Sequence, residues 1–124
     1  MAGKQPAFTE NFTQNLTNIR TFLGPERKGL FQRLLDRLFD QVVPTLCRFP
    51  QAGRRFLSHR VRSKESKAIL AKLRDRLEAS DDLREFIMED YLLLYLVRGD
   101  TIVFLSIKHH RQLSFDLGRF WQEA

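Results

Sequence analysis

The sequence predicts an α+β fold, in which an N-terminal helical hairpin packs on a small antiparallel β-sheet and an extra basic helix is inserted before the sheet. Two segments with apolar residues at helical spacing open the chain, and three short apolar runs rich in β-branched and aromatic residues follow later. The 124 residues fit one domain, residues 1–124, and 43% of them are hydrophobic. This composition excludes a disordered chain, a collagen-like repeat and a disulfide scaffold.

The first helix is predicted to begin after Thr9, whose hydroxyl can accept from the free backbone N–H groups of a first turn. Before it, residues 7–8 could form one short strand. Gly24 and Pro25 should end the helix, because glycine tolerates a left-handed residue and proline cannot continue the hydrogen-bond ladder. The apolar residues that share one face of this helix are Phe12, Leu16, Ile19, Phe22 and Leu23.

The second helix should carry a wide apolar stripe between residues 30 and 43. Pro44 is expected to end or kink it, and Phe49-Pro50 with Gly53 marks a loop. A third helix can start at the capping residue Ser63 and run to Ser80. This third helix is the basic insertion before the sheet.

Three extended runs follow, at residues 83–88, 91–97 and 101–108. The middle run is almost continuously apolar, which is typical of a strand covered on both faces. Gly99-Asp100 is a good two-residue hairpin turn, whereas Glu89-Asp90 is a weaker turn signal. In the last run, alternation predicts one shared face for Val103, Leu105 and Ile107.

The chain has no pattern that predicts export or membrane insertion. Its first residues hold no apolar signal region, and its longest apolar run, residues 91–97, is too short to span a bilayer. Cys47 is the single cysteine, so no disulfide can form within the chain. We therefore expect a cytoplasmic protein without a membrane partner.

The excess positive charge is confined to one quarter of the sequence. Residues 51–80 hold nine basic and three acidic residues, a surplus of six that equals the net charge of +6 of the whole chain. Such a field attracts a polyanion, most often nucleic acid, although a solvated helix face would give the same pattern. The residues of this segment that we predict to bind nucleic acid are Arg54, Arg55, Arg60, Arg62, Lys64 and Lys67.

The end of the last strand carries a dense group of cationic and protonatable side chains, residues 107–112. Neighbouring residues on a strand point to opposite faces, so His109 and His110 are poorly placed to share one metal ion. No further carboxylate or cysteine lies at a ligand spacing nearby. We expect no metal and no cofactor.

Acid–base chemistry on a phosphodiester suits this cluster better. Histidine can donate or accept a proton near neutral pH, and Arg111 could stabilise the extra negative charge of a pentacoordinate phosphate. Lys108 adds a cation, and Phe115 offers a flat surface for an unpaired base. The alternative is structural: His109 and His110 finish a strand, and Phe115 fills the core.

Several segments together resemble the RelE/ParE toxin superfamily. They are LREFIMEDYLLLY at residues 83–95, VRGDTI at 97–102 and IKHHR at 107–111, with AFTENFTQNL at 7–16 and FPQAGR at 49–54. The resemblance implies the toxin of a type II toxin–antitoxin pair, whose partner is a cognate antitoxin protein. RelE-like members cut messenger RNA on the ribosome without a metal, and ParE-like members poison DNA gyrase.

The resemblance also implies roles for individual residues. Arg111 matches the phosphate-stabilising arginine of the RelE-like branch, and the basic residues of the middle segment fall where RelE-like toxins hold theirs. Phe115 stands where that branch often has a tyrosine or histidine, so a general acid would have to be His109 or His110. We expect a ribosome-dependent endoribonuclease first, a gyrase inhibitor second, and a non-catalytic module that binds nucleic acid or antitoxin third.

Overall fold

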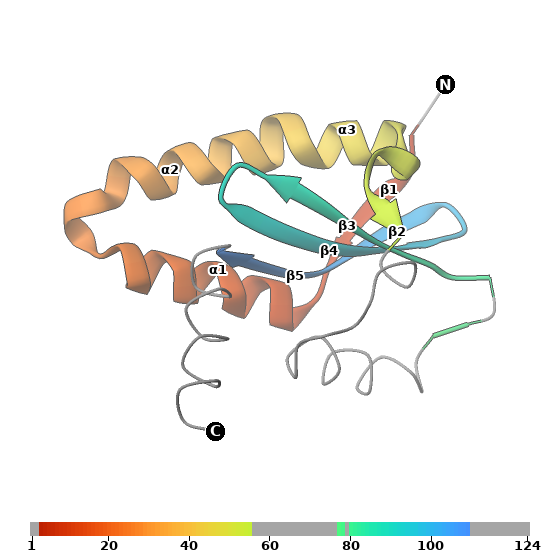
Figure 1. Ribbon diagram of the computed structural model, residues 1–124, viewed down its shortest axis with the longest axis horizontal. Coiled ribbons are helices and arrows are strands. Elements are labelled where there is room, and N and C mark those ends of the chain that lie inside the picture. Colours follow the sequence, from red (N-terminus) through yellow and green to blue (C-terminus); the bar gives the residue numbers. More distant parts are fainter. Residues whose placement is uncertain (1–2, 56–76, 79, 110–124) are drawn as a thin grey trace.

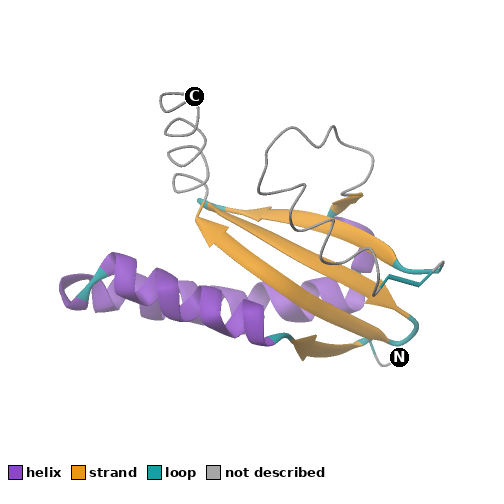
Figure 2. Cartoon of the chain, turned by 90° about the horizontal axis from the view of Figure 1, so that it is seen from below, coloured by secondary structure: helices purple, strands orange, loops and turns teal. Residues whose placement is uncertain are grey.

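The helices of this protein cover one face of a β-sheet, as Figures 1 and 2 show in two orientations. A computed structural model describes residues 3–55, 77–78 and 80–109. The expected helix from Ser63 to Ser80 falls mostly outside these residues, and its described positions Leu77 and Glu78 are not helical. The α+β architecture expected from the sequence is confirmed.

Helix α1 spans Glu10–Leu23 and begins and ends as predicted. The Thr9 side-chain oxygen accepts from the backbone N–H of Phe12 at 3.1 Å, which caps the first turn. Gly24 adopts φ 78°, a conformation that favours glycine, and Pro25 opens the short turn that leads to the next helix.

Helix α2 spans Lys28–Arg37 and continues through a π-helical turn, Leu38–Val42, into α3, Val43–Arg48. Pro44 was expected to end or kink the helix, and it does not end it. The wide turn finishes just before α3, where the Val43 N–H bonds to the Leu38 carbonyl. Pro44 then sits in the first turn of α3, a position that tolerates a residue without a backbone N–H.

The sheet has five strands in the order β1-β5-β4-β3-β2. It is mixed rather than purely antiparallel, because β1 (Gln5–Phe8) pairs in parallel with β5. The other pairs are antiparallel, and the two tight turns expected between β3, β4 and β5 are confirmed, with Glu89 at φ 54° and Gly99 at φ 55°. The remaining strands are β2 (Arg54–Arg55), β3 (Asp82–Met88), β4 (Tyr91–Arg98) and β5 (Thr101–His109).

A β-bulge at Leu105 changes the faces of β5. On β4, Leu94 and Tyr95 are neighbours, but their partners Ser106 and Phe104 have Leu105 between them. The predicted shared face of Val103, Leu105 and Ile107 is therefore wrong, because the extra residue shifts the alternation and turns Ile107 toward the helices.

Helix α1 holds this bulge by side-chain hydrogen bonds. Asn15, only 5% exposed, accepts from the Ile107 N–H at 3.1 Å, and Asn11 donates to the Leu105 carbonyl at 2.9 Å. The Thr9 hydroxyl donates toward the same carbonyl at 3.1 Å. The backbone groups that the bulge takes out of the ladder thus find partners on the helix.

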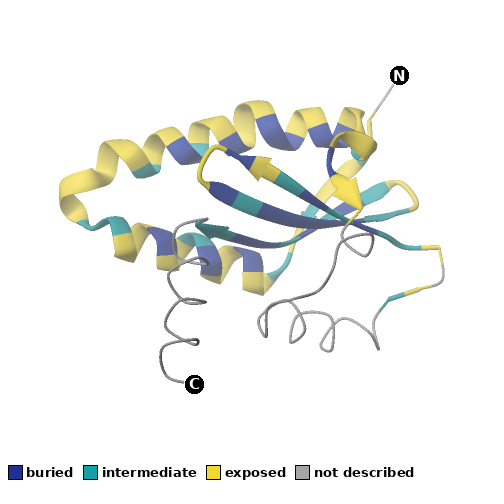
Figure 3. Ribbon diagram, in the orientation of Figure 1, coloured by how far each residue is buried: buried dark blue, intermediate teal, exposed yellow. Residues whose placement is uncertain are grey.

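Strand β4 is covered on both faces, as its apolar sequence predicts. One face contributes Leu93 and Tyr95 to the core under the helices, and the other contributes Leu94 and Leu96 to a second apolar cluster. Figure 3 shows the matching pattern on the helices, which bury the stripe facing the sheet and expose the rest. The burial on both faces confirms that β4 is a central strand.

Candidate functional site at the end of the sheet

Four of the predicted site residues lie in the described part of the chain: Arg54 and Arg55 in β2, and Lys108 and His109 at the end of β5. The others lie outside the described residues, and their roles stay predictions; they are Arg60, Arg62, Lys64, Lys67, His110, Arg111 and Phe115.

The strand register places Arg54 and Lys108 on the same face of the sheet. Arg54 pairs with Glu85, Glu85 pairs with Leu94, and Lys108 pairs with Leu92, two residues from Leu94 on the same strand. Residues two apart on a strand point to the same side, and strand spacings put the two Cα atoms roughly 15 Å apart. This face, opposite the helices, is called the basic face below.

His109 lies on the other side of the sheet. It pairs with Tyr91, whose ring it meets edge-on at a centroid distance of 5.0 Å, and its ring is 6.1 Å from that of Phe22 on α1. The half-buried imidazole lines a groove of about 510 Å³ between α2 and the β3–β4 turn. The structure therefore brings Arg54 and Lys108 to one face and separates His109 from them.

The loop that leads to Arg54 is fixed by the buried Tyr95 hydroxyl. This hydroxyl accepts from the Gly53 N–H at 3.0 Å and donates to the Pro50 carbonyl at 2.6 Å, while Arg84 donates to the Gly53 carbonyl at 2.7 Å. Burial raises the pKa of Tyr95, so the phenol stays protonated at neutral pH and keeps both hydrogen bonds.

A Cβ atom at Gly53 would lie 2.4 Å from the Tyr95 Oη and 2.6 Å from the Glu85 carbonyl oxygen. The glycine is thus required by a close approach of backbone to side chain rather than by its own φ. Sequence reasoning placed Gly53 in a loop and Tyr95 in a strand, but it missed that the two touch.

Carboxylates accompany several arginines along the β2–β3 edge. Arg54 donates to Glu85 at 3.1 Å, Arg84 donates to Asp82 at 2.6 Å, and Arg98 holds Asp81 by two hydrogen bonds of 2.9 and 2.7 Å. Glu85 is 8% exposed, so its pairing with Arg54 offsets the cost of burying a charge. These ion pairs hold Arg54, Arg84 and Arg98 in place.

Acidification is expected to remove the stabilising contribution of Asp81. The hydrogen bonds from Arg98 hold the pKa of Asp81 below its usual range. Because the folded pKa is lower than the unfolded value, near 3.9, the contribution is complete above that value and is lost as the pH falls through the folded pKa. In urea unfolding measured down to about pH 2, the free energy of unfolding should therefore fall less steeply with pH in Asp81→Asn than in the native protein. Asp100→Asn, at an exposed position, is the control. If the free energy of unfolding fell equally steeply with pH in both variants, the role given to Asp81 would be wrong.

The described residues offer no evident metal centre. Among them, no three side chains of histidine, cysteine, aspartate or glutamate gather at metal-binding distance. In the same part of the chain, every helix is too short or too polar to cross a bilayer. The described residues supply here the cations of Arg54 and Lys108, the imidazole of His109 and tyrosine hydroxyls.

A helical hairpin across one face of a five-stranded mixed sheet is consistent with a RelE/ParE-like toxin fold. The chain belongs to this family: the family model described as ParE toxin of type II toxin-antitoxin system, parDE, matches residues 7–114. A search of the curated proteins finds no match. The protein is therefore the toxin of a type II toxin–antitoxin pair, and its family implies an antitoxin partner.

Proposed function

We propose that this toxin acts by binding and inhibiting DNA gyrase, and that it does not cut messenger RNA. The position of His109 carries the proposal. Its ring packs against Tyr91 and Phe22 on the helix-covered face, whereas Lys108 and Arg54 lie on the opposite face. A phosphodiester bound by the basic face would thus meet cations without this imidazole.

Two further observations support the same function. The family model that matches residues 7–114 is described as a ParE toxin, and the resemblance assigns gyrase to the ParE-like branch. Phe115, which stands where RelE-like toxins often carry a proton-transferring side chain, cannot move a proton. The basic face then serves to approach a polyanionic target, such as the gyrase–DNA complex, by long-range attraction.

A ribosome-dependent endoribonuclease is the second candidate, and the run Lys108-His109-His110-Arg111 favours it. In that mechanism, Arg111 would stabilise the phosphate in the transition state while His110 or His109 shuttles a proton. Both candidate functions are compatible with growth arrest. A test that distinguishes them must therefore show whether DNA or messenger RNA is damaged.

The test is to produce the toxin in a bacterial host and to follow two readouts after induction. One is a reporter of DNA damage, with a gyrase poison as positive control, and the other is primer-extension mapping of messenger RNA. We expect a damage response with intact messages. Cuts at codon boundaries that vanish in Arg111→Ala would instead establish the endoribonuclease.

The basic segment can be tested by measuring the affinity of the purified toxin for gyrase at several salt concentrations. Replacing Arg60, Arg62 and Lys64 together by glutamine should weaken target binding about tenfold or more and flatten its salt dependence, because phosphate or carboxylate contacts are lost. The matched control replaces three exposed basic residues of the helical side: Arg27, Arg33 and Arg48. Equal weakening in both triple variants would mean that overall charge, rather than this segment, guides binding.

A further inference from the structure

The face of the sheet that lies away from the helices carries an apolar patch. Leu83 on β3 pairs with Leu96 on β4, and Leu94 lies two residues from Leu96 on the same face. The helical hairpin lies against the other face, as Figure 2 shows. These three leucines are called the outer apolar patch below.

The outer apolar patch is nearly inaccessible to solvent, because its leucines are only 3% or 4% exposed. Val103 and Leu105 on β5 pack beside them, but both are only partly buried themselves. Neighbours within one sheet flank a side chain without covering its tip, so the cover must come from above the sheet. Among the described residues, Leu77 supplies an apolar contact from outside the sheet.

The chain is held on both sides of the stretch that leads to Leu77. Strand β2, which ends directly before residues 56–76, pairs with β3. On the other side, Arg98 donates to Asp81 at 2.9 and 2.7 Å, and Asp81 accepts from the Glu78 N–H at 2.6 Å. Residues 56–76 lie outside the described ranges, but the chain thus leaves and rejoins these ranges next to β3.

The residues before Leu77 have the sequence pattern that a cover for this patch needs. Ile69, Leu70 and Leu73 precede Leu77 by eight, seven and four residues, a spacing that places all of them on one face of a helix. Basic residues fall on the other side of such a helix; they are Lys64, Lys67 and Lys72. The segment therefore combines an apolar stripe with a cationic outer side.

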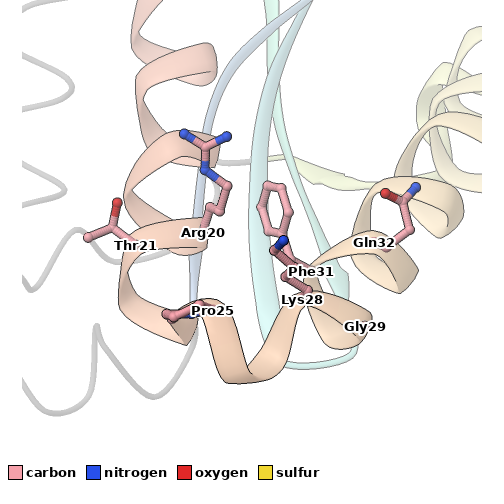
Figure 4. A pocket seen from close by; sticks show the side chains of 8 residues that line it. Arg20, Thr21, Pro25, Lys28, Gly29, Phe31 and Gln32 are labelled. Atoms are coloured by element: carbon pink, nitrogen blue, oxygen red, sulfur yellow. The ribbon is translucent and has the colours of Figure 1, made fainter.

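A partner that binds the helices would not cover this patch. The groove at the turn of the hairpin, with a volume of about 720 Å³, is lined by side chains of α1, α2 and the turn between them (Figure 4). An occupant of that groove would stay on the helical side of the sheet. Residues 64–76, in contrast, are tethered beside the patch, and a tether raises the effective concentration of the segment at its site.

We propose that residues 64–76 form an amphipathic helix that docks its apolar stripe on the outer apolar patch. Ile69, Leu70 and Leu73 would extend the contact that Leu77 makes, and the cations of the helix would stand above the basic face. A polyanion that approaches this side would then meet the helix before it meets the sheet. The inference rests on the buried patch and holds for gyrase and for RNA as the target.

Hydrogen exchange, measured by mass spectrometry on the purified full-length toxin, tests this docking. Amides of residues 64–76 should exchange about tenfold or more slowly than in an unstructured chain of the same sequence. Leu94→Ala should accelerate their exchange about tenfold and leave α1 unchanged, because the deleted side chain lies under the segment. Leu93→Ala is the matched control: Leu93 is buried on the helical face, so its effect should fall on α1 and α2 instead.

A second pair of variants keeps the test decisive if a β4 variant fails to fold. Leu70→Ser with Leu73→Ser should uncover the patch and raise the binding of a hydrophobic fluorescent dye several-fold. Lys67→Ser with Lys72→Ser changes the other side of the same helix and should leave dye binding at the native level. Equal dye binding in the two variants would overturn the proposal. Exchange of residues 64–76 at the unstructured rate in the native toxin would also overturn it, and a dimeric toxin would then assign the patch to a second copy.

Discussion

Replacing Phe104 with alanine is expected to lower the free energy of unfolding by about 3–5 kcal/mol, the usual range for a buried phenylalanine. Phe104 is 0% exposed. Its ring stacks on that of Phe8 at 5.2 Å, and the rings of Phe12 and Tyr95 lie at 6.0 and 6.1 Å. The loss would remove a large share of the stability of about 5–15 kcal/mol that is normal for a domain.

Urea unfolding followed by circular dichroism measures this effect. Phe49→Ala is the matched control, because Phe49 follows α3 and is 60% exposed. We expect its midpoint to shift by less than a third of the Phe104→Ala shift, about 1 kcal/mol or less. Equal shifts would contradict the view that the contact between β1, β5 and α1 is the centre of the core.

The second large effect is expected at Gly53. Gly53→Ala should destabilise the protein by about 3 kcal/mol or more, because its Cβ would overlap with the Tyr95 hydroxyl and with the backbone of Glu85. Tyr95→Phe should cost about 1–3 kcal/mol, since the Gly53 N–H and the Pro50 carbonyl would lose their partner.

A double-mutant cycle separates the two causes. Combining Gly53→Ala with Tyr95→Phe removes the hydroxyl that the new methyl group would strike. The double variant should therefore lose less free energy of unfolding than the sum of the losses in the two single variants. Full additivity would mean that Gly53 and Tyr95 act independently. Hydrogen exchange at the Arg54 amide reports whether the contacts of Tyr95 with Gly53 and Pro50 also stabilise β2. This exchange should be faster in each single variant than in the native protein.

Helices and strands were predictable because local patterns set them. Thr9 and Gly24-Pro25 bound α1 by capping and by the missing N–H of proline, and the turn at Gly99 needs a positive φ that glycine supplies. The weaker turn signal at Glu89 also proved sufficient, since β3 and β4 bury enough apolar surface to hold that residue at φ 54°. The burial of both faces of β4 was also predictable, because its run of apolar residues is almost unbroken.

The predictions that proved wrong concern features that depend on contacts between residues far apart in the sequence. The bulge at Leu105 inverts the alternation of β5, and it is stabilised by Asn15, which precedes it by ninety residues and carries no signal of this role in the sequence. Pro44 was expected to end or kink the helix, yet a π-helical turn before it lets the helix continue. The parallel pairing of β1 likewise depends on the whole fold.

The candidate site was predictable in composition but not in arrangement. Charge alone pointed to Arg54 and Lys108, and the register now places both on one face. Neighbouring residues on a strand point to opposite faces, so Lys108 and His109 were expected to separate, but only the strand register shows which of the two shares the face of Arg54.

Inhibition of gyrase by this toxin can be measured with purified components. The toxin is added to gyrase, relaxed plasmid and ATP, and supercoiling is measured beside primer-extension mapping of messenger RNA in a bacterial translation extract. If the toxin inhibits gyrase, supercoiling stops or cleaved plasmid accumulates, while messages stay intact. Unaffected gyrase, together with messages cut at codon boundaries by the native toxin and left whole by Arg111→Ala, would contradict it.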